Sequence, residues 1–510
     1  MTLEPPYETF EHTYSNGRAQ VVWTRLIDDL ETPVSAFLKI ALGRPYAFLF
    51  ESVEGGAWRG RYSIIAMAPD LVWRCRGDVA EIAEGEAIAA GEFTVQPTGA
   101  LDSLRDLVAR TRLDLPAGLP PMAAGLFGAL GYDMVRLVER LPGVNRDPLG
   151  LPDAVMIRPA IVAIFDAIAQ EIVLVTTARP DGSTASAAYD RARERLDAVI
   201  AGLARPLPAP RGHAAPEASD LASPTSRAAY REMVERAKAY IRAGDIFQVV
   251  PSHRFSGPFL LDPFALYRSL RRTNPSPFLY YLNFPGFQLI GSSPEILVRL
   301  RDGKITIRPI AGTRPRGANP TEDAGLEAEL LADEKERAEH LMLLDLGRND
   351  VGRVAMLREA GRNAPRIPPG RAAVRVTESF VVERFSHVMH IVSNVEGDAP
   401  EGLDPVDVLM AALPAGTLSG APKVRAMQII DELESVKRGI AYAGAVGYFG
   451  ADGSVDTCIV LRTGLITDGV LHVQAGGGVV ADSDPDAEYE ETLHKAAALR
   501  RAAEEAWRFA

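Results

Sequence analysis

A proline-rich segment from Pro206 to Pro224 divides the chain into two parts of unequal length. The segment reads PLPAPRGHAAPEASDLASP, and its five prolines stand among alanine, serine and glycine. Proline lacks a backbone N–H and fixes its own φ angle, so this stretch cannot continue a helix or a central strand. We therefore predict an N-terminal domain over residues 1–205, a linker over 206–224 and a second domain over 225–510.

Helix and strand signals are mixed on both sides of this linker. Thr32-Pro33 begins a short helix before it, and Ser226 caps a helix after it. Longer helices are expected around 189–203, over 322–346 and from 485 onward. Strands are expected at 46–53, 62–66, 161–165, 172–176, 246–250, 279–282, 287–291, 305–310, 380–395, 444–449, 457–463 and 470–474. This irregular order predicts an α+β fold rather than a regularly alternating parallel sheet.

Composition excludes several classes of protein. The formal net charge of -12 disfavours binding to nucleic acid or to an anionic membrane, because both repel an acidic surface. The two cysteines, Cys75 and Cys458, are too few for a disulfide framework or a cysteine-based zinc site. The N-terminus lacks the basic and apolar regions of a signal peptide, and no apolar run reaches the ~18 residues of a membrane helix. We expect a soluble cytoplasmic enzyme.

Two pairs of glutamates stand out by their spacing. Glu336 and Glu339 are three residues apart in a helical stretch, and Glu488 and Glu491 repeat that spacing in the closing helix. Residues three apart lie on the same face of a helix, so two such pairs can surround one hard cation such as Mg²⁺. Most pairs of this kind are ordinary solvated helix surface, so the spacing alone does not establish a metal site.

A family resemblance gives these glutamates a context. Six motifs occur in order along the second part: IAGTRPRG from Ile310, HLMLLDLGRND from His340, GTLSGAPKVRAMQ from Gly416, AGAVGYF from Ala443, DTCIVLRT from Asp456 and VQAGGGVVADSDP from Val473. Together they resemble the chorismate-utilising enzymes, specifically anthranilate synthase component I. The first part resembles the family through FESVEGG (50–56) and RYSIIA (61–66). The resemblance implies large mixed or antiparallel sheets flanked by helices, with the N-terminal domain packed against them.

The resemblance also implies roles for individual residues. Glu339 and Glu491 would hold Mg²⁺, with Glu336 and Glu488 in the same cluster, directly or through water. The substrate chorismate would be bound by Gly312, Thr313, Tyr448, Arg462, Gly476, Gly477, Gly478 and Lys495. Arginine offers a planar fork to a carboxylate, and glycine lets backbone N–H groups approach an anion closely.

Three residues are the expected catalytic groups. Glu295 in GSSPE matches the family's general acid, which would protonate the departing ring hydroxyl. Such an acid must stay protonated near neutral pH, so we expect its pKa to be raised. His390 matches a histidine near the ring and is a candidate for proton transfer during pyruvate loss, with Thr313 beside it.

Two positions distinguish the reactions of this family. Para-aminobenzoate synthases resembling this chain carry a nucleophilic lysine before Gly-Thr, where this chain has Ala311. Isochorismate and salicylate synthases carry a lysine base where this chain has Gln248. The remaining reaction is that of a lyase, in which ammonia attacks ring C2 and pyruvate is eliminated to give anthranilate, the first committed step of tryptophan biosynthesis. The alternatives are a para-aminobenzoate (aminodeoxychorismate) synthase component and a non-catalytic, tryptophan-sensing subunit.

Regulation and partners are also implied by the resemblance. Ser52 and the segment Asn274-Pro275-Ser276-Pro277 match the family's site for feedback inhibition by tryptophan. Neither cysteine stands in a glutaminase-like motif, so ammonia is expected from glutamine through a separate glutamine amidotransferase subunit. The expected assembly is a heterotetramer of two large and two small subunits.

Overall fold

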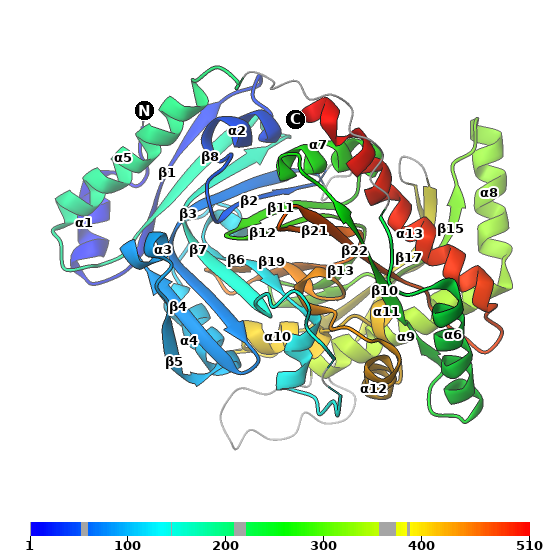
Figure 1. The fold of residues 1–510 in the computed structure, drawn as a ribbon. Coiled ribbons are helices and arrows are strands. Elements are labelled where there is room, and N and C mark those ends of the chain that lie inside the picture. The colour runs from blue at the N-terminus through cyan, green and yellow to red at the C-terminus, as the bar shows by residue number, and fades with distance from the viewer. Residues whose placement is uncertain (1, 53–59, 144, 209–220, 356–373, 385–387) are drawn as a thin grey trace.

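The computed structural model describes residues 2–510 except 53–59, 144, 209–220, 356–373 and 385–387. Two layers of antiparallel strands face one another, and helices cover the outer side of each layer (Figure 1). The α+β prediction is therefore confirmed. None of the helices in the described ranges combines the length and the apolar character that crossing a lipid bilayer requires.

Among the described residues the first layer contains ten strands, each paired antiparallel with its neighbour. In spatial order these are β1 (Gln20–Ile27), β8 (Glu171–Ala178), β7 (Ala154–Asp166), β3 (Tyr62–Arg76), β2 (Ala47–Glu51), β11 (Phe278–Phe284), β12 (Phe287–Ser293), β21 (Thr463–Thr467), β22 (Val470–Gly476) and β10 (Ser252–Pro258).

The second layer shares β3 and β7 with the first. Its other strands, in spatial order, are β5 (Thr94–Gly99) and β4 (Val79–Glu84) on one side of the shared pair, and β6 (Gly125–Leu130), β19 (Ala445–Gly450), β20 (Val455–Ile459), β13 (Ile296–Arg301), β14 (Lys304–Ile307) and β17 (Val388–Asp398) on the other. Strand β17 pairs further with β15 (Ile310–Pro315) and β16 (Arg375–Arg384). A separate pair consists of β9 (Gln248–Val249) and β18 (Gly420–Ala421).

Strands β3 and β7 belong to both layers because β3 changes direction near its middle. Ala68 has a positive φ of 52°, and the pairing of β3 with β7 shifts register between Pro69 and Leu71. The first half of β3 pairs with β2 and the second half with β4. Strands from the two parts of the chain also pair directly, β2 with β11 and β6 with β19. The predicted domain boundaries at 205 and 225 remain a prediction, and residues 209–220 of the linker lie outside the described residues.

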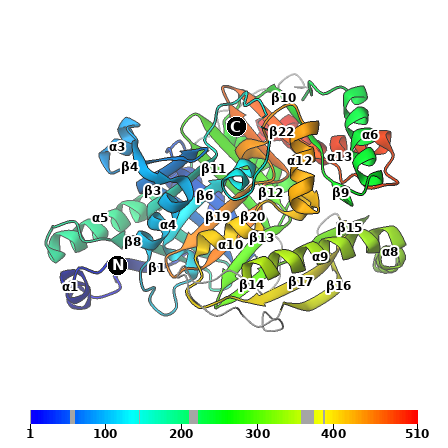
Figure 2. The same ribbon diagram turned by 90° about the horizontal axis from the view of Figure 1, so that it is seen from below.

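Three main apolar cores follow from this layering. Between the layers, Phe48 and Tyr280 of the first meet Phe127 and Val446 of the second. The outer face of the first layer packs against α1 (Tyr7–Ser15), α2 (Pro33–Ile40), α5 (Ala185–Leu203), α7 (Pro263–Thr273) and α13 (Pro485–Glu505). The outer face of the second packs against α4 (Ala100–Thr111), α9 (Glu334–Ala355), α10 (Pro405–Ala412) and α12 (Lys423–Leu433). Figure 2 shows α9 and α10 side by side on this face.

The remaining helices are short or lie at the edge of the molecule. They are α3 (Glu86–Ala90), α6 (Arg227–Arg242), α8 (Pro320–Ala332), α11 (Gly416–Ser419) and the 3₁₀ turns η1 (Pro121–Ala123), η2 (Tyr132–Leu137), η3 (Gly439–Ala441) and η4 (Ala506–Phe509). The predicted helix starts are confirmed. The side chains of Thr32, Ser226 and Asp484 accept backbone N–H groups at the first turns of α2, α6 and α13.

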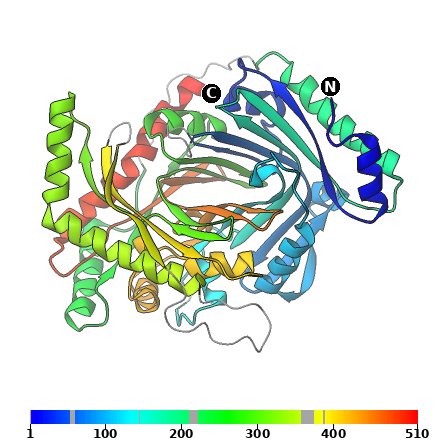
Figure 3. The same cartoon turned by 180° about the vertical axis from the view of Figure 1, so that it is seen from behind.

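Several predicted elements are wrong in extent. The helix expected over 322–346 is two helices, α8 and α9, which meet at a sharp angle (Figure 3). The break occurs at Asp333, whose Oδ1 accepts the backbone N–H groups of Lys335 and Glu336 and so caps α9.

Three of the predicted strands are also divided, and one is shorter. The strand expected over 380–395 is β16 and β17, with 385–387 outside the described residues, and that over 305–310 is β14 and the start of β15. The strand expected over 457–463 is β20 and β21, because Arg462 takes a positive φ of 49° between them. Only Gln248 and Val249 are extended within 246–250.

Candidate active site

Glu295 lies in the short connection between β12 and β13, where the backbone of the second layer holds it. Ile459 of β20 donates its N–H to the Glu295 carbonyl at 3.0 Å. The side chain is only 8% exposed and lines a small cavity together with Leu343 and Gly347 of α9 and Thr417 of α11. The walls of this cavity keep most water away from the carboxyl group.

Burial raises the pKa of Glu295 to about 8, and the nearby Thr417 and the positive charge of Arg462 offset this only in part. A carboxyl group in these surroundings keeps its proton at neutral pH, because ionisation would place a charge in a poorly hydrated cavity. The expectation of a raised pKa is therefore met. Glu295 can donate a proton to an oxygen that enters the cavity.

The charge of Arg462 acts on both predicted proton-transfer groups. Its charge lowers the pKa of Glu295 and also that of His390, so the guanidinium lies within electrostatic reach of each. The Arg462 carbonyl accepts the N–H of Ser292 at 3.2 Å, which ties this residue to the end of β12. A planar cation in this position can bind a carboxylate and orient it between the acid and the imidazole.

His390 and Thr313 face each other across the β15–β17 pair. The His390 Nδ1 atom lies 2.9 Å from the Gly312 carbonyl and 3.0 Å from the Thr313 hydroxyl. A carbonyl accepts only, so Nδ1 carries the proton and Nε2 carries the lone pair. Burial lowers the pKa of His390 to about 4. The imidazole is therefore neutral at physiological pH and can accept a proton.

Gly312 brings β15 against the start of α9. Its φ is +76°, and a Cβ atom here would lie 3.3 Å from Glu336 Oε2 and 3.2 Å from Leu330. Any other residue would be strained at this angle and would crowd both neighbours. The other oxygen of Glu336, Oε1, accepts from Arg314 Nη1 at 3.2 Å. Gly312 thus allows the strand that carries Thr313 to approach the acidic helix closely.

The predicted metal ligands come together from two helices. Glu336 and Glu339 lie near the start of α9, and Glu488 and Glu491 lie near the start of α13. The pKa of Glu339 is raised, first by partial removal from water and then by the negative charges of Glu336 and Glu491. The pKa of Glu488 is raised by burial and by Glu491. The two pairs are therefore close enough to repel one another.

The carboxylate oxygens of Glu488 differ in their surroundings. Oε1 accepts from the Ser483 hydroxyl at 2.7 Å, whereas Oε2 is buried and has no hydrogen-bond partner among the described residues. No three acidic, histidine or cysteine side chains in the described ranges converge into a ready-made metal cage. Mg²⁺ binds through one or two carboxylates and keeps several waters, so an unpartnered oxygen among mutually repelling carboxylates suits it. The magnesium site remains a prediction that this donor set fits.

Lys495 contacts the acidic cluster and the glycine segment. Its Nζ atom forms an ion pair with Glu491 Oε1 at 2.6 Å and donates to the Gly476 carbonyl at 3.0 Å. The side chain is about half exposed, at 45%. In this structure the predicted substrate-binding lysine therefore holds α13 against the end of β22.

The three glycines lie close to three different parts of the chain. A Cβ atom on Gly476 would lie 2.5 Å from the Pro251 carbonyl, one on Gly477 would lie 2.6 Å from Glu488 Oε2, and one on Gly478 would lie 2.6 Å from Gln248 Nε2. The backbone contact excludes a side chain at Gly476, whereas a side chain at Gly477 or Gly478 would displace the end of Glu488 or Gln248. The segment thus passes between β10, α13 and β9, directly beside the acidic cluster.

Tyr448 does not join the other predicted residues. Its ring packs on Phe127 in the core between the two layers, and its hydroxyl accepts from Arg301 Nη2 at 3.1 Å. Tyr442 lies in the expected place instead, because its hydroxyl is 3.1 Å from where a Cβ of Gly476 would be. Burial first, and then neighbouring charges that include Glu491, raise the pKa of Tyr442. The structure therefore offers Tyr442, which the sequence analysis missed, as the tyrosine of the site.

The predicted tryptophan residues also lie together. Strand β2 pairs with β11 so that Glu51 is opposite Leu279, which places Ser52 beside the segment that leads into β11. The Oγ atoms of Ser52 and Ser276 and the Nδ2 atom of Asn274 are buried and have no hydrogen-bond partner among the described residues. Pro275 and Pro277 flank Ser276. Most of the FESVEGG motif, residues 53–56, lies outside the described residues.

Comparisons with known proteins agree with the family resemblance. Residues 70–501 match the family described as chorismate binding enzyme. A protein of Cereibacter sphaeroides named anthranilate synthase component 1 is 56% identical, covering 99% of this chain and 98% of its own length. One of the same name from Pseudomonas putida is 48% identical over 93% of each chain. The crystal structure of anthranilate synthase component I from Streptococcus pneumoniae, 34% identical, superposes with a TM-score of 0.74 over 93% of this chain and 98% of that chain.

Proposed function

Because this chain belongs to the chorismate binding enzyme family, we propose that it is component 1 of anthranilate synthase, a lyase that converts chorismate and ammonia to anthranilate and pyruvate. The observation that carries the proposal is the buried Glu295 carboxyl, protonated at neutral pH and sharing Arg462 as a neighbour with the neutral His390. These three groups are an acid, a carboxylate anchor and a base, which is what the two steps of the reaction need.

The first step replaces the ring hydroxyl by an amine. Ammonia adds at ring C2 while the C4 hydroxyl leaves as water with the proton of Glu295, and the added nitrogen gives up a proton. In the second step a base, for which His390 is the candidate, takes the C2 proton and the C3–O bond breaks. The leaving enolpyruvate gains a proton at its methylene carbon and becomes pyruvate. Arg462 would hold a substrate carboxylate throughout, and the Gly476–Gly478 segment lies beside Tyr442, Glu488 and Gln248. A magnesium ion held by Glu339 and Glu491, with Glu336 and Glu488 in the same cluster directly or through water, would supply positive charge to the ring carboxylate.

The identity of the nucleophile is supported by two positions. Ala311 precedes Gly312 on β15, so no lysine is available there to attack the ring. Gln248 faces Gly478 and has a side-chain amide, which cannot act as a base toward water. Ammonia is itself a nucleophile, so its reaction needs neither a lysine that attacks the ring nor a base that activates water. These residues favour anthranilate over aminodeoxychorismate or isochorismate as the product.

Fluorescence detection of anthranilate tests this function. We expect purified protein with chorismate, Mg²⁺ and ammonium at mildly alkaline pH to form anthranilate, and excess EDTA to stop the reaction. Isochorismate or aminodeoxychorismate as product would mean that the roles of Gln248 or Ala311 are different. No turnover under any of these conditions would favour a non-catalytic, tryptophan-sensing subunit.

A second subunit is part of this proposal. The relatives are named component 1, and the two cysteines of this chain are both buried, which raises the pKa of Cys75 to about 12 and that of Cys458 further. A buried thiol of this kind is not a nucleophile at neutral pH. Glutamine hydrolysis therefore requires a separate glutamine amidotransferase, component 2, and two copies of each chain would form the heterotetramer.

Feedback inhibition by tryptophan is proposed at Ser52 and the segment 274–277. The unpartnered polar atoms of Ser52, Asn274 and Ser276 give an amino acid three hydrogen-bonding groups to satisfy. A route to the active site begins next to them, because the Ser292 hydroxyl donates to the Asn274 carbonyl at 2.5 Å and the Ser292 N–H donates to the Arg462 carbonyl. Bound tryptophan would favour an arrangement of Arg462 that is less active.

Replacing Ser52 by Ala is expected to weaken tryptophan inhibition about 10- to 150-fold, since one hydrogen bond to a charged ligand is worth roughly 1.5–3 kcal/mol. The rate without tryptophan should stay close to that of the wild type, because no described contact joins Ser52 to a catalytic group. The measurement is the tryptophan concentration that halves anthranilate formation. Ser183→Ala, a change at a partly buried serine of the first part whose hydroxyl contacts Tyr14 and Arg191, serves as control. Unchanged inhibition in Ser52→Ala would remove Ser52 from the site.

A further inference from the structure

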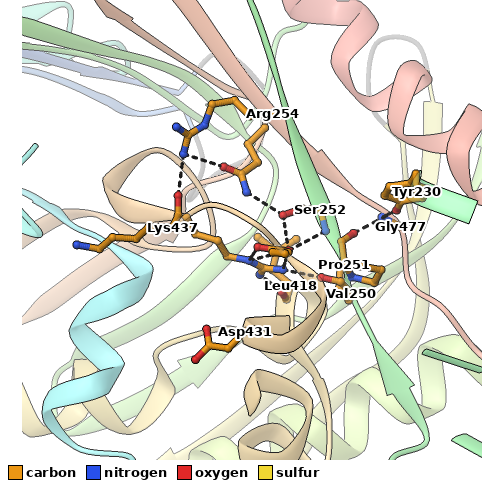
Figure 4. Close-up of polar contacts among 12 residues, drawn as sticks. Tyr230, Val250, Pro251, Ser252, Arg254, Leu418, Asp431, Lys437 and Gly477 are labelled. Carbon is orange, nitrogen blue, oxygen red and sulfur yellow. Dashed lines mark hydrogen bonds and ion pairs between the residues drawn. The ribbon is translucent and has the colours of Figure 1, made fainter. Parts of the chain in front are cut away.

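A buried ion pair lies next to the candidate active site but contains none of its predicted residues. Glu434 follows α12, and Arg438 precedes η3. They are 6% and 2% exposed, respectively, and the Arg438 Nε atom lies 3.0 Å from Glu434 Oε2. Taking two charges out of water is costly, so the contacts that this pair makes need an explanation. Figure 4 shows the polar contacts around it.

Arg438 donates to the backbone of two segments that are far apart in sequence. Its Nη1 atom donates to the Leu418 carbonyl at 2.7 Å, and its Nη2 atom donates to the Val250 carbonyl at 2.6 Å (Figure 4). Leu418 follows Thr417, which lines the cavity of Glu295, and Val250 follows the strand that carries Gln248. One guanidinium therefore fixes two walls of the site relative to each other.

Glu434 holds a third segment. Its Oε1 atom accepts both the backbone N–H and the hydroxyl of Ser252 at 2.8 Å. Ser252 is the first residue of β10 and lies opposite Gly476 of β22. On the other side of this strand start, the Tyr230 hydroxyl donates to the Pro251 carbonyl at 3.2 Å and accepts the N–H of Gly477 at 3.2 Å (Figure 4). The glycine segment is thereby fixed against β10.

The faces of the guanidinium are also in contact with the site. Arg438 lies over the ring of Tyr442 at 5.3 Å and over that of Tyr132 at 4.9 Å. Cation–π contacts of this length hold a ring in place as well as the cation. Tyr442 is the residue whose hydroxyl lies beside Gly476. Hydrogen bonds at the edge and ring contacts at the faces leave the Arg438 guanidinium little freedom.

We propose that Arg438, oriented by Glu434, is a positioning residue that sets the geometry between the Thr417 wall of the Glu295 cavity, the Gln248 strand and the Tyr442–Gly476 side of the site. This inference rests on the proposed function, since its readout is anthranilate formation. Lysine cannot replace this arginine, because an ammonium lacks the planar fork that reaches two carbonyls and a carboxylate at once. A small displacement of catalytic groups reduces turnover strongly even when the fold is kept.

The test is Arg438→Lys, which keeps the charge and removes the fork. We expect kcat/KM for chorismate to fall at least about tenfold, mostly through kcat, because misplacement by about 1 Å can cost roughly 100-fold. The alkaline limb of the pH–rate profile should also move, since loss of the bond to the Leu418 carbonyl would shift the Thr417 wall of the Glu295 cavity. A purely structural arginine would lower the unfolding midpoint without changing either kinetic quantity.

Arg158→Lys is the matched control. Arg158 is largely buried and forms an ion pair with Asp70 at 2.6 Å, and no described contact joins either residue to the site. This variant should lose stability with unchanged kcat and KM. If Arg438→Lys does not fold, the double variant Arg438→Gln with Glu434→Gln removes both buried charges and remains testable. The double variant should fold and stay at least about tenfold slower, because one amide cannot reach both carbonyls.

The outcomes separate the two proposals. Wild-type protein that makes no anthranilate contradicts the proposed function before any variant is compared. An active wild type, with a folded Arg438→Lys whose kcat, KM and alkaline limb stay within about twofold of it, overturns the positioning role. A double variant with full turnover also overturns the positioning role, because the site would then keep its geometry without the Arg438 guanidinium.

Discussion

Replacing Glu295 by Gln is expected to lower kcat by about 100- to 10,000-fold, the usual contribution of a positioned general acid. The amide has nearly the same shape as the carboxylic acid and cannot release a proton to the leaving hydroxyl. The fold should be kept, because Glu295 is buried in its neutral form and an amide adds no charge. The measurement is the initial rate of anthranilate formation with saturating chorismate and ammonia.

The pH dependence provides an independent check on the same group. The pKa of Glu295 is about 8, so the fraction in the active, protonated form falls as pH rises through that value. We expect kcat/KM, compared at a constant concentration of unprotonated ammonia, to fall about tenfold per pH unit above the pKa. The free energy of unfolding should also fall as pH rises. The pKa of Glu295 is higher in the folded state than in the unfolded state, so the unfolded state releases this proton at lower pH and is favoured until pH passes the folded pKa.

Asp166→Asn is the control for the Glu295→Gln substitution. Asp166 is also a buried carboxyl, 7% exposed, but it pairs with Arg61 at 2.7 Å in a turn far from the site. That variant should lose stability and keep its kcat. A Glu295→Gln protein with more than about a tenth of wild-type kcat would show that another group donates the proton.

Local signals in the sequence predicted the starts of helices well. Thr32, Ser226 and Asp484 cap helices because the capping hydrogen bond involves only residues two or three positions away. The break at Asp333 was missed although it uses the same chemistry. An aspartate inside a polar stretch has no distinguishing pattern. Both helices pack on β15 and β17, and α9 continues onto β14, an arrangement that depends on tertiary structure.

For a buried strand, the side to which each residue points is harder to predict than the presence of the strand. Strand β19 was expected, but nearly all of its residues are buried, so no alternation of polar and apolar residues indicates which side each faces. Tyr448 was assigned to the site and lies instead in the core between the layers. Tyr442 occupies its place because η3 ends beside Gly476, a contact that depends on tertiary structure alone.

The acidic cluster shows what helical spacing predicts and what only the packing of the helices determines. Helical spacing correctly predicted that Glu336 and Glu339 share a face, as do Glu488 and Glu491. That the two faces meet is a property of how α9 and α13 pack around the glycine segment. Lys495 pairs with Glu491 one helical turn away, and its hydrogen bond to the Gly476 carbonyl again depends on how α13 packs on β22.

Glu491→Gln is expected to abolish measurable activity and to change how the protein responds to magnesium. Without Mg²⁺ the variant should be at least as stable as the wild type, because the charge of Glu491 disfavours the ionised forms of Glu339 and Glu488. With Mg²⁺ at about 100 times its dissociation constant, the wild type should gain roughly 2.7 kcal/mol of stability. The variant should gain much less, since one carboxylate ligand is gone. Thermal unfolding with and without Mg²⁺ measures this directly and does not depend on turnover.

Glu490→Gln is the matched control for this prediction, because it changes the next residue of the same helix. Glu490 forms its ion pair with Arg227 on the solvent side of α13 and does not raise the pKa of Glu339 or Glu488. Its variant should keep both the activity and the full stabilisation by Mg²⁺, since an exposed ion pair contributes only about 0–1 kcal/mol. Equal stabilisation of Glu491→Gln and Glu490→Gln by Mg²⁺ would contradict a metal site at Glu491. In that case the repulsion among the carboxylates would be relieved by Lys495 alone, and the cation of the reaction would have to bind through Glu339 and Glu488 or at another place.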